Sequence, residues 1–142
     1  MMNSEDPTAP KPEKLAPDRD QLARARVLAS AALDRKAEDL IALDMRGLTS
    51  LADTFLIASG SSDRQVRAIA DAVLDAARQA GIRALGHEGL EEARWALLDF
   101  GDAIFHIFRE DIRGLYDLER LWADAPQFEI EPVEVKPRRA KA

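Results

Sequence analysis

Apolar residues along the chain recur first at helical and then at strand spacing, and this alternation predicts the secondary structure. Between Asp18 and Asp34 they recur every three or four positions, which predicts a helix with Asp18 or Asp20 as its N-cap. Short apolar runs at 40–43 and 54–58 predict two buried strands. The first part of the chain is therefore expected to read helix, strand, strand.

The clearest helical pattern follows the second strand. Ser62 with Gln65 three positions later forms the signature of a capping box, and an apolar stripe at helical spacing extends from there to Ala77. Gly81 is expected to end this helix, and residues 82–86 are expected to form a short strand.

A hairpin and a final helix are predicted next. Residues 95–100 and 103–109 form the two strands around a tight turn at Gly101 and Asp102. A last helix is expected over about 111–123. Its inward residues are predicted to be Leu115, Leu118, Leu121 and Trp122.

The predicted order is α-β-β-α-β-β-β-α, which indicates an α/β (α+β) fold with a mixed sheet of about five strands and helices packed on it. The domain is expected to span 18–125. Proline and charge dominate 1–17 and 126–142, which are predicted to be disordered tails.

Charge narrows the choice of partners. Of the net −6, the whole amount lies between residues 86 and 125, where ten acidic residues face four arginines. Such a field repels a phosphate backbone and favours a basic protein partner, so no direct nucleic-acid specificity is expected. The chain has no cysteine, no secretory signal pattern at its start and no apolar run of membrane length. We expect a cytoplasmic protein.

No assembled catalytic or metal site is evident from the sequence. The turn Gly60-Ser61-Ser62 resembles a phosphate-gripping turn of nucleotidyltransferases, but the acids that follow, Asp71 and Asp75, have helical spacing and form no metal-binding pair. His87 and His106 lack a third ligand at suitable spacing, and no GxSxG motif is present. We therefore expect no enzyme, no cofactor and no bound metal.

The hairpin and last helix suggest a binding face instead. Alternation along the strand places Trp95, Leu97 and Asp99 on one side and Leu98 on the other. On the last helix the off-stripe residues are Tyr116, Glu119 and Arg120. An aromatic residue with carboxylates nearby suits a partner with apolar surface rimmed by lysine or arginine, although an ordinary amphipathic sheet and helix would show the same pattern.

An ordered set of motifs across 18–125 resembles the Iojap/ribosomal silencing factor family. The matching segments are KAEDLIALD (36–44), ADTFLIASGSS (52–62), GHEG (86–89), WALLDFGD (95–102), HIF (106–108) and YDLERLW (116–122). The resemblance implies a degenerate nucleotidyltransferase-like fold without catalysis.

The same resemblance implies a partner, large-subunit ribosomal protein fourteen, and a role in which the large ribosomal subunit is kept from joining the small one. It also implies that the free protein can form a homodimer. The contact residues that it implies are Trp95, Leu97, Leu98, Asp99, Tyr116 and Glu119. Two alternatives stay open, namely a nucleotidyltransferase that uses the Gly60-Ser61-Ser62 turn and a general acidic adaptor for basic proteins.

Overall fold

The computed structural model describes residues 16–130, which fold around one mixed sheet with helices on both faces. In chain order the elements are α1 (Arg19–Asp34), β1 (Glu38–Asp44), β2 (Thr54–Gly60), α2 (Asp63–Gln79), β3 (Gly86–Glu88), β4 (Trp95–Asp99), β5 (Ala103–Arg109), α3 (Glu110–Tyr116), α4 (Leu118–Leu121) and β6 (Gln127–Phe128). The strands lie in the order β3-β4-β5-β2-β1-β6. Only the central pair β2–β5 is parallel among these strands. The predicted mixed-sheet α/β fold is confirmed.

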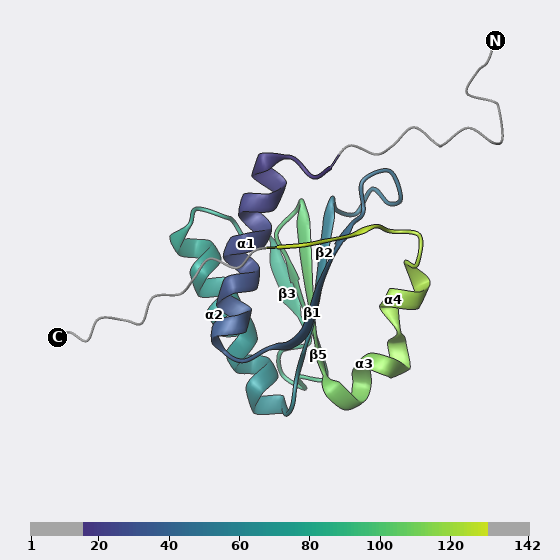
Figure 1. Cartoon of the computed structure of the whole chain (residues 1–142). Coiled ribbons are helices and arrows are strands. Elements are labelled where there is room, and N and C mark those ends of the chain that lie inside the picture. Colours follow the sequence, from purple (N-terminus) through teal and green to yellow (C-terminus); the bar gives the residue numbers. More distant parts are fainter. Residues whose placement is uncertain (1–15, 131–142) are drawn as a thin grey trace, which may run out of the picture.

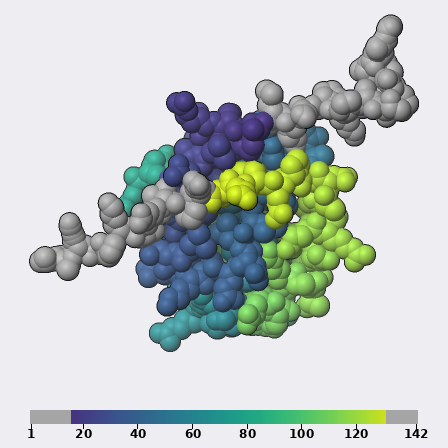
Figure 2. All heavy atoms as spheres, in the orientation of Figure 1, coloured from purple at the N-terminus to yellow at the C-terminus, as the bar shows by residue number. Residues whose placement is uncertain are grey.

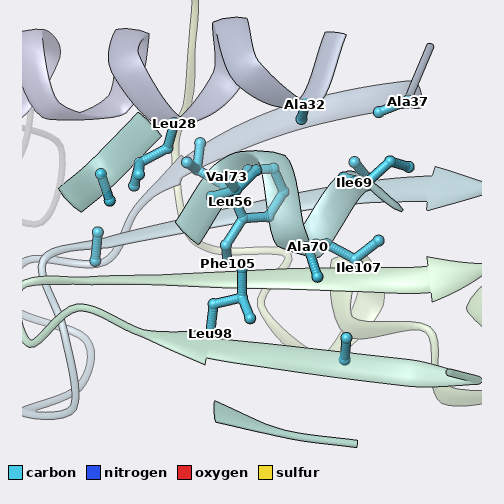
Figure 3. Packing of buried hydrophobic residues seen from close by; sticks show 14 of the residues in the cluster. Leu28, Ala32, Ala37, Leu56, Ile69, Ala70, Val73, Leu98, Phe105 and Ile107 are labelled. Carbon is cyan, nitrogen blue, oxygen red and sulfur yellow. The ribbon is translucent and has the colours of Figure 1, made fainter. Parts of the chain in front are cut away.

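Helices α1 and α2 cover one face of the sheet, and the shorter α3 and α4 lie on the other (Figure 1). On the α1–α2 side the apolar stripes of both helices meet the sheet in one core. Figure 3 shows Leu56 and Phe105 of the central strands beneath Leu28, Ile69 and Val73 of the helices, and all five are fully buried. Each such side chain contributes on the order of 1.5–3 kcal/mol through burial, so this layer anchors the fold.

The two long helices begin where their sequence caps predict. The Asp18 carboxylate accepts the backbone N–H of Gln21, and the Ser62 hydroxyl accepts that of Gln65. The reciprocal half of the expected capping box differs, because the Gln65 amide oxygen accepts from the N–H and hydroxyl of Ser61 and not from Ser62. Gly81 follows α2 with a positive φ of 79°, as expected for a residue that ends a helix.

The predicted last helix over 111–123 is wrong in one respect, because the helix is broken. Asp117 has a left-handed conformation (φ 50°, ψ 55°) that ends α3 and begins α4. The break rotates the second segment relative to the first. Leu118 stays buried and Trp122 half-buried, whereas Leu115 and Leu121, both expected to face inward, are 73% and 67% exposed.

Two strands differ from the prediction. The strand expected at 82–86 lies at Gly86–Glu88, and a sixth strand, β6, lies within the expected disordered tail 126–142 and pairs with β1. Figure 2 shows the segment that contains β6 crossing the surface between α1 and the α3–α4 pair. The rest of that expected tail (131–142), and the expected N-terminal tail up to residue 15, lie outside the described residues.

Within residues 16–130, no helix has the length and apolar character that a bilayer-spanning segment needs.

Candidate functional site

The sheet face beneath α3 and α4 carries a second apolar cluster that these short helices cover incompletely. Its buried members come mainly from β1, β2, β5 and the last helices, and Trp95, Leu97 and Trp122 pack against it while remaining partly exposed. We call this side, with its exposed residues on β4 and α3, the α3–α4 face. It is the only described sheet face on which the predicted contact residues reach the surface.

Alternation along β4 decides which predicted contact residues reach that face. Trp95, Leu97 and Asp99 are half-buried, whereas Leu98 is completely buried with the α1–α2 core. The structure therefore places Leu98 on the opposite side of the sheet from Trp95, as the strand period requires. Leu98 cannot meet a partner directly, and the contact role that the resemblance implied for it does not fit this structure.

Trp95 and Tyr116 lie side by side, although 21 positions separate them in the sequence. Their ring centroids are 4.6 Å apart with an interplanar angle of 47°. Trp95 also stacks on Phe108 of β5, its direct partner across the strand pair, at 5.0 Å and 28°. Tyr116, the last residue of α3, keeps 53% of its surface exposed. The pair forms an apolar patch in which Trp95 is packed against the sheet and Tyr116 is exposed to solvent.

A shallow hollow of about 180 Å³ lies beside this pair and is lined by Gly89, Glu92, Arg94, Trp95 and Tyr116. Glu92 and Gly89 were not among the residues predicted from the sequence. The sequence gives little indication of their role. Both belong to a turn that precedes β4, and only the folded hairpin brings this turn against the Trp95 backbone. A Cβ added to Gly89 would lie 2.1 Å from the Trp95 carbonyl oxygen, so glycine is required there.

The two predicted carboxylates occupy different places around the patch. Asp99 stands at the far end of β4, four residues and about 13 Å along the strand from Trp95, where its Oδ1 accepts the backbone N–H of Gly101. It is therefore not beside Trp95, as the sequence pattern had suggested. Glu119 lies on α4, where its Oε2 accepts from Nε and Nη2 of Arg113 at 3.1 and 2.9 Å.

Arg113 connects the α3–α4 pair to the sheet. Its side chain is 11% exposed, and its Nη1 donates to the Ser59 hydroxyl of β2 at 2.8 Å. Because Arg113 holds Glu119 with its other nitrogens, α4 is tied to both α3 and β2. This mostly buried, charge-assisted link stabilises the helix break on which the position of Tyr116 depends.

The two histidines lie in different surroundings. His106 of β5 is 4% exposed among aromatic rings, and burial lowers its pKa to about 4. His87 is exposed on the edge strand β3. Across residues 16–130, no three acidic or histidine side chains converge as a metal site would require.

The Gly60-Ser61-Ser62 turn is closed by the chain's own groups. Gln65 occupies the N–H and hydroxyl of Ser61, while the Ser62 hydroxyl caps α2. Asp71 and Asp75 lie about two and three turns further along α2, and Asp75 pairs with Arg78 of its own helix. The groups that a nucleotidyl transfer would need together are therefore apart.

Comparison with known proteins gives a consistent result. A family model described as "Ribosomal silencing factor during starvation" matches residues 18–142. Ribosomal silencing factor RsfS of Bacillus subtilis (strain 168) is 47% identical over 106 residues, which cover 75% of this chain and 90% of that protein. The chloroplastic protein Iojap of Arabidopsis thaliana is 34% identical over 113 residues, covering 80% of this chain and 47% of that one.

Solved structures agree with the sequence matches. A crystal structure of a protein from Chromobacterium violaceum superposes with a TM-score of 0.70 at 33% identity, covering 82% of this chain and 94% of that one. A second, from Bacillus halodurans, gives a TM-score of 0.67 at 42% identity, covering 75% of this chain and 96% of that one.

Proposed function

The chain belongs to the ribosomal silencing factor family, and from that premise we propose that it represses translation by binding the large ribosomal subunit and excluding the small one. The family role as a ribosomal silencing factor is the starting point. The partner, the binding face and the steric mechanism are our proposal. Binding to ribosomes would place the protein in the cytoplasm.

The proposed partner is large-subunit ribosomal protein fourteen, and charge supports a basic partner of this kind. The segment from 86 to 125, which contains β4, β5, α3 and α4, carries ten acidic residues against four arginines. A negative field over one part of the surface steers a positively charged partner toward it and repels nucleic acid. The same field would keep the protein off exposed ribosomal RNA while it docks on protein.

The single observation that carries the proposal is the Trp95–Tyr116 pair, in which Tyr116 is exposed and Trp95 half-buried. Large aromatic side chains on a rigid base are the residues that most often dominate the energy of a protein interface. Here β5 and Phe108 fix the base, Leu97 extends the apolar surface along β4, and Glu119 adds a carboxylate on α4. Asp99 adds a second carboxylate at the far end of the strand.

The proposed mechanism needs no catalytic step. A domain seated on a surface that the small subunit must contact blocks joining by its volume alone, and repression lasts as long as it stays bound. The closure of the Gly60-Ser61-Ser62 turn by Gln65 supports binding over nucleotidyl transfer. In the free protein, the same apolar patch is a surface through which two copies could pair as a homodimer.

The test is co-sedimentation with purified large subunits. Tyr116→Ala and Trp95→Ala should each weaken binding by roughly 2 kcal/mol or more, which is about thirtyfold in affinity. Tyr116→Ala is the cleaner probe, because more than half of the side chain is exposed and its loss leaves the core intact.

Leu33→Ala is the matched control, because Leu33 is a partly exposed apolar residue at the end of α1, on the opposite face of the sheet. It should bind as the unaltered protein does. If Tyr116→Ala and Trp95→Ala both bind large subunits as well as the unaltered protein does, the α3–α4 face is not the docking surface.

A further inference from the structure

The indole N–H of Trp95 is already engaged within the protein. It donates to Nδ1 of His106 at 3.1 Å. His106 pairs directly with Leu97 across β4 and β5, so it lies diagonally opposite Trp95 on the same face of the sheet. This hydrogen bond reaches down from the half-buried indole to a residue that is 4% exposed.

The His106 ring is itself held in place by its neighbours. Phe55 of β2 meets it edge-on, with centroids 4.8 Å apart and an interplanar angle of 67°, and Phe108 lies nearly parallel to it at 6.4 Å and 12°. These contacts on two sides restrict the rotation of the ring, and they favour the position in which Nδ1 accepts from Trp95. The hydrogen bond in turn restricts the indole that donates to it.

A histidine at this position has a cost that an apolar residue would avoid. When Nδ1 accepts, the neutral ring carries its proton on Nε2, and that buried atom has no hydrogen-bond partner among the described residues. A leucine or phenylalanine would fill the same space without an unpaired polar atom. Among the described contacts, what the imidazole provides and an apolar side chain would not is an acceptor for the Trp95 N–H.

The hydrogen bond also changes what Trp95 presents outward. With its only donor engaged inside, the exposed part of the ring is carbon. A partner group that matches it is aliphatic or cationic, such as the methylene stem or charged head of lysine or arginine stacked on the ring. A carbonyl or carboxylate acceptor on the partner would find no donor on Trp95.

We propose that His106 is a positioning residue for docking: its Nδ1 holds the Trp95 indole in a fixed orientation and leaves the ring carbons as the surface that a lysine- or arginine-bearing partner contacts. This inference rests on the proposed function, because it assigns a role within that docking face. Its physical basis is preorganisation, since a ring fixed before binding loses less conformational freedom when the partner arrives.

The hydrogen bond can be observed directly in the unaltered protein. With ¹⁵N labelling, nuclear magnetic resonance should show a scalar coupling between Nε1 of Trp95 and Nδ1 of His106. Trp122→Phe identifies which of the two indole signals belongs to Trp95. Absence of the coupling, with the Trp95 indole proton exchanging as fast as an exposed one, would overturn the proposal without any variant of His106.

Two substitutions then connect the hydrogen bond to binding. His106→Leu removes the acceptor and keeps an apolar volume, whereas His106→Asn retains an acceptor oxygen at the position of Nδ1. We expect His106→Leu to weaken binding to large subunits on the order of tenfold and His106→Asn to recover most of that loss. His87→Leu is the matched control, because His87 is exposed and pairs with Leu98, on the opposite face of the sheet.

The outcomes separate this inference from the proposed function. If Tyr116→Ala abolishes binding but folded His106→Leu binds as the unaltered protein does, the docking face stands and the positioning role is wrong. If His106→Asn binds as weakly as His106→Leu while both stay folded, the acceptor is not what matters, and the positioning role is again wrong. If Tyr116→Ala and Trp95→Ala both bind normally, the docking face itself fails.

Discussion

Gly89 lies against the backbone of Trp95 at a distance that only glycine permits. Its φ is 82°, and a Cβ would lie 2.1 Å from the Trp95 carbonyl oxygen, a backbone atom that cannot move away cheaply. The Gly89 carbonyl in turn accepts the N–H of Ala93, which closes the turn before β4. The position of the main aromatic residue thus depends on a neighbour that has no side chain.

We predict that Gly89→Ala lowers the free energy of unfolding by about 2–4 kcal/mol, because it adds both a steric clash and a left-handed penalty. Gly86→Ala is the control from the same segment, since no heavy atom lies within 4 Å of its added Cβ. That change should stay within about 0.5 kcal/mol. Urea denaturation measures both, and equal midpoints for the two variants would contradict the account.

His106 links stability to pH. Burial lowers its pKa to about 4 from an ordinary value of 6.5, so the unfolded chain binds the proton more readily than the folded one. The resulting stability is present above pH 6.5 and is lost as the pH falls toward 4. Between pH 7 and pH 5 we expect a loss of about 2 kcal/mol from this group.

The comparison with His106→Asn isolates that contribution, because every other titrating group is common to the two proteins. The unaltered protein should lose about 2 kcal/mol more than the variant between these two pH values. Thermal or urea unfolding at pH 7 and pH 5 gives the difference. If the two proteins lose the same stability, His106 is not held neutral in the folded state.

At the residue scale, the sequence predicts which side of β4 a residue faces, because a strand has a period of two. This separates Trp95 and Leu97 from Leu98 without any structure. It does not predict partners across strands. The Trp95–His106 hydrogen bond arises from strand pairing, and the position of Glu92 beside Trp95 arises from the turn before β4. Residue spacing specifies neither.

The break between α3 and α4 is the element on which the site depends most. Asp117 accepts the N–H groups of Arg120 and Leu121 at its carbonyl while its own N–H donates to Arg113. One left-handed residue thus ends one helix and starts the next. It leaves Tyr116 at the end of α3, against Trp95.

Substitution of Asp117 distinguishes a broken helix from a continuous one. In a left-handed position glycine is best tolerated and alanine worst, whereas in a helix interior the order is reversed. We therefore predict that Asp117→Gly is equal to or more stable than the unaltered protein, by up to about 1 kcal/mol. Asp117→Ala should be less stable by about 1 kcal/mol. The opposite order in urea denaturation would mean that residues 110–121 form a single helix.

At the element scale, the sequence predicts the long helices and the central strands well, because each has several apolar residues at one period. It places β3 a few residues too early, at 82–86 instead of Gly86–Glu88, and it does not predict β6. Both are short edge strands held by backbone pairing, with few buried side chains to give a pattern. The break at Asp117 was also missed, since an aspartate within an otherwise helical sequence does not indicate a left-handed conformation.

At the scale of the whole molecule, the two faces of the sheet differ in how completely helices cover them. The α1–α2 face carries the larger apolar core, and the α3–α4 face carries a smaller cluster that ends in exposed aromatic rings. The acidic excess lies in the segment 86–125, which supplies β3, β4, β5, α3 and α4. The α1–α2 face stabilises the fold, and the α3–α4 face is the one that we propose for a basic partner.

The helix and strand order of this arrangement was predictable, but the parallel pairing of β2 with β5 was not. That pairing joins segments about 50 residues apart and places β4 next to the centre of the sheet. The apolar pattern predicts that both strands are buried, but not that they are neighbours.

The central claim is that the α3–α4 face blocks subunit joining, and light scattering of purified ribosomal subunits tests it most directly. Added to large subunits before small ones, the unaltered protein and Leu33→Ala should suppress the rise in scattering that accompanies joining. Tyr116→Ala should need roughly thirtyfold more protein for the same suppression. If Tyr116→Ala suppresses joining as well as the unaltered protein does, the α3–α4 face is not the docking surface. If both proteins bind large subunits and neither suppresses joining, binding does not exclude the small subunit.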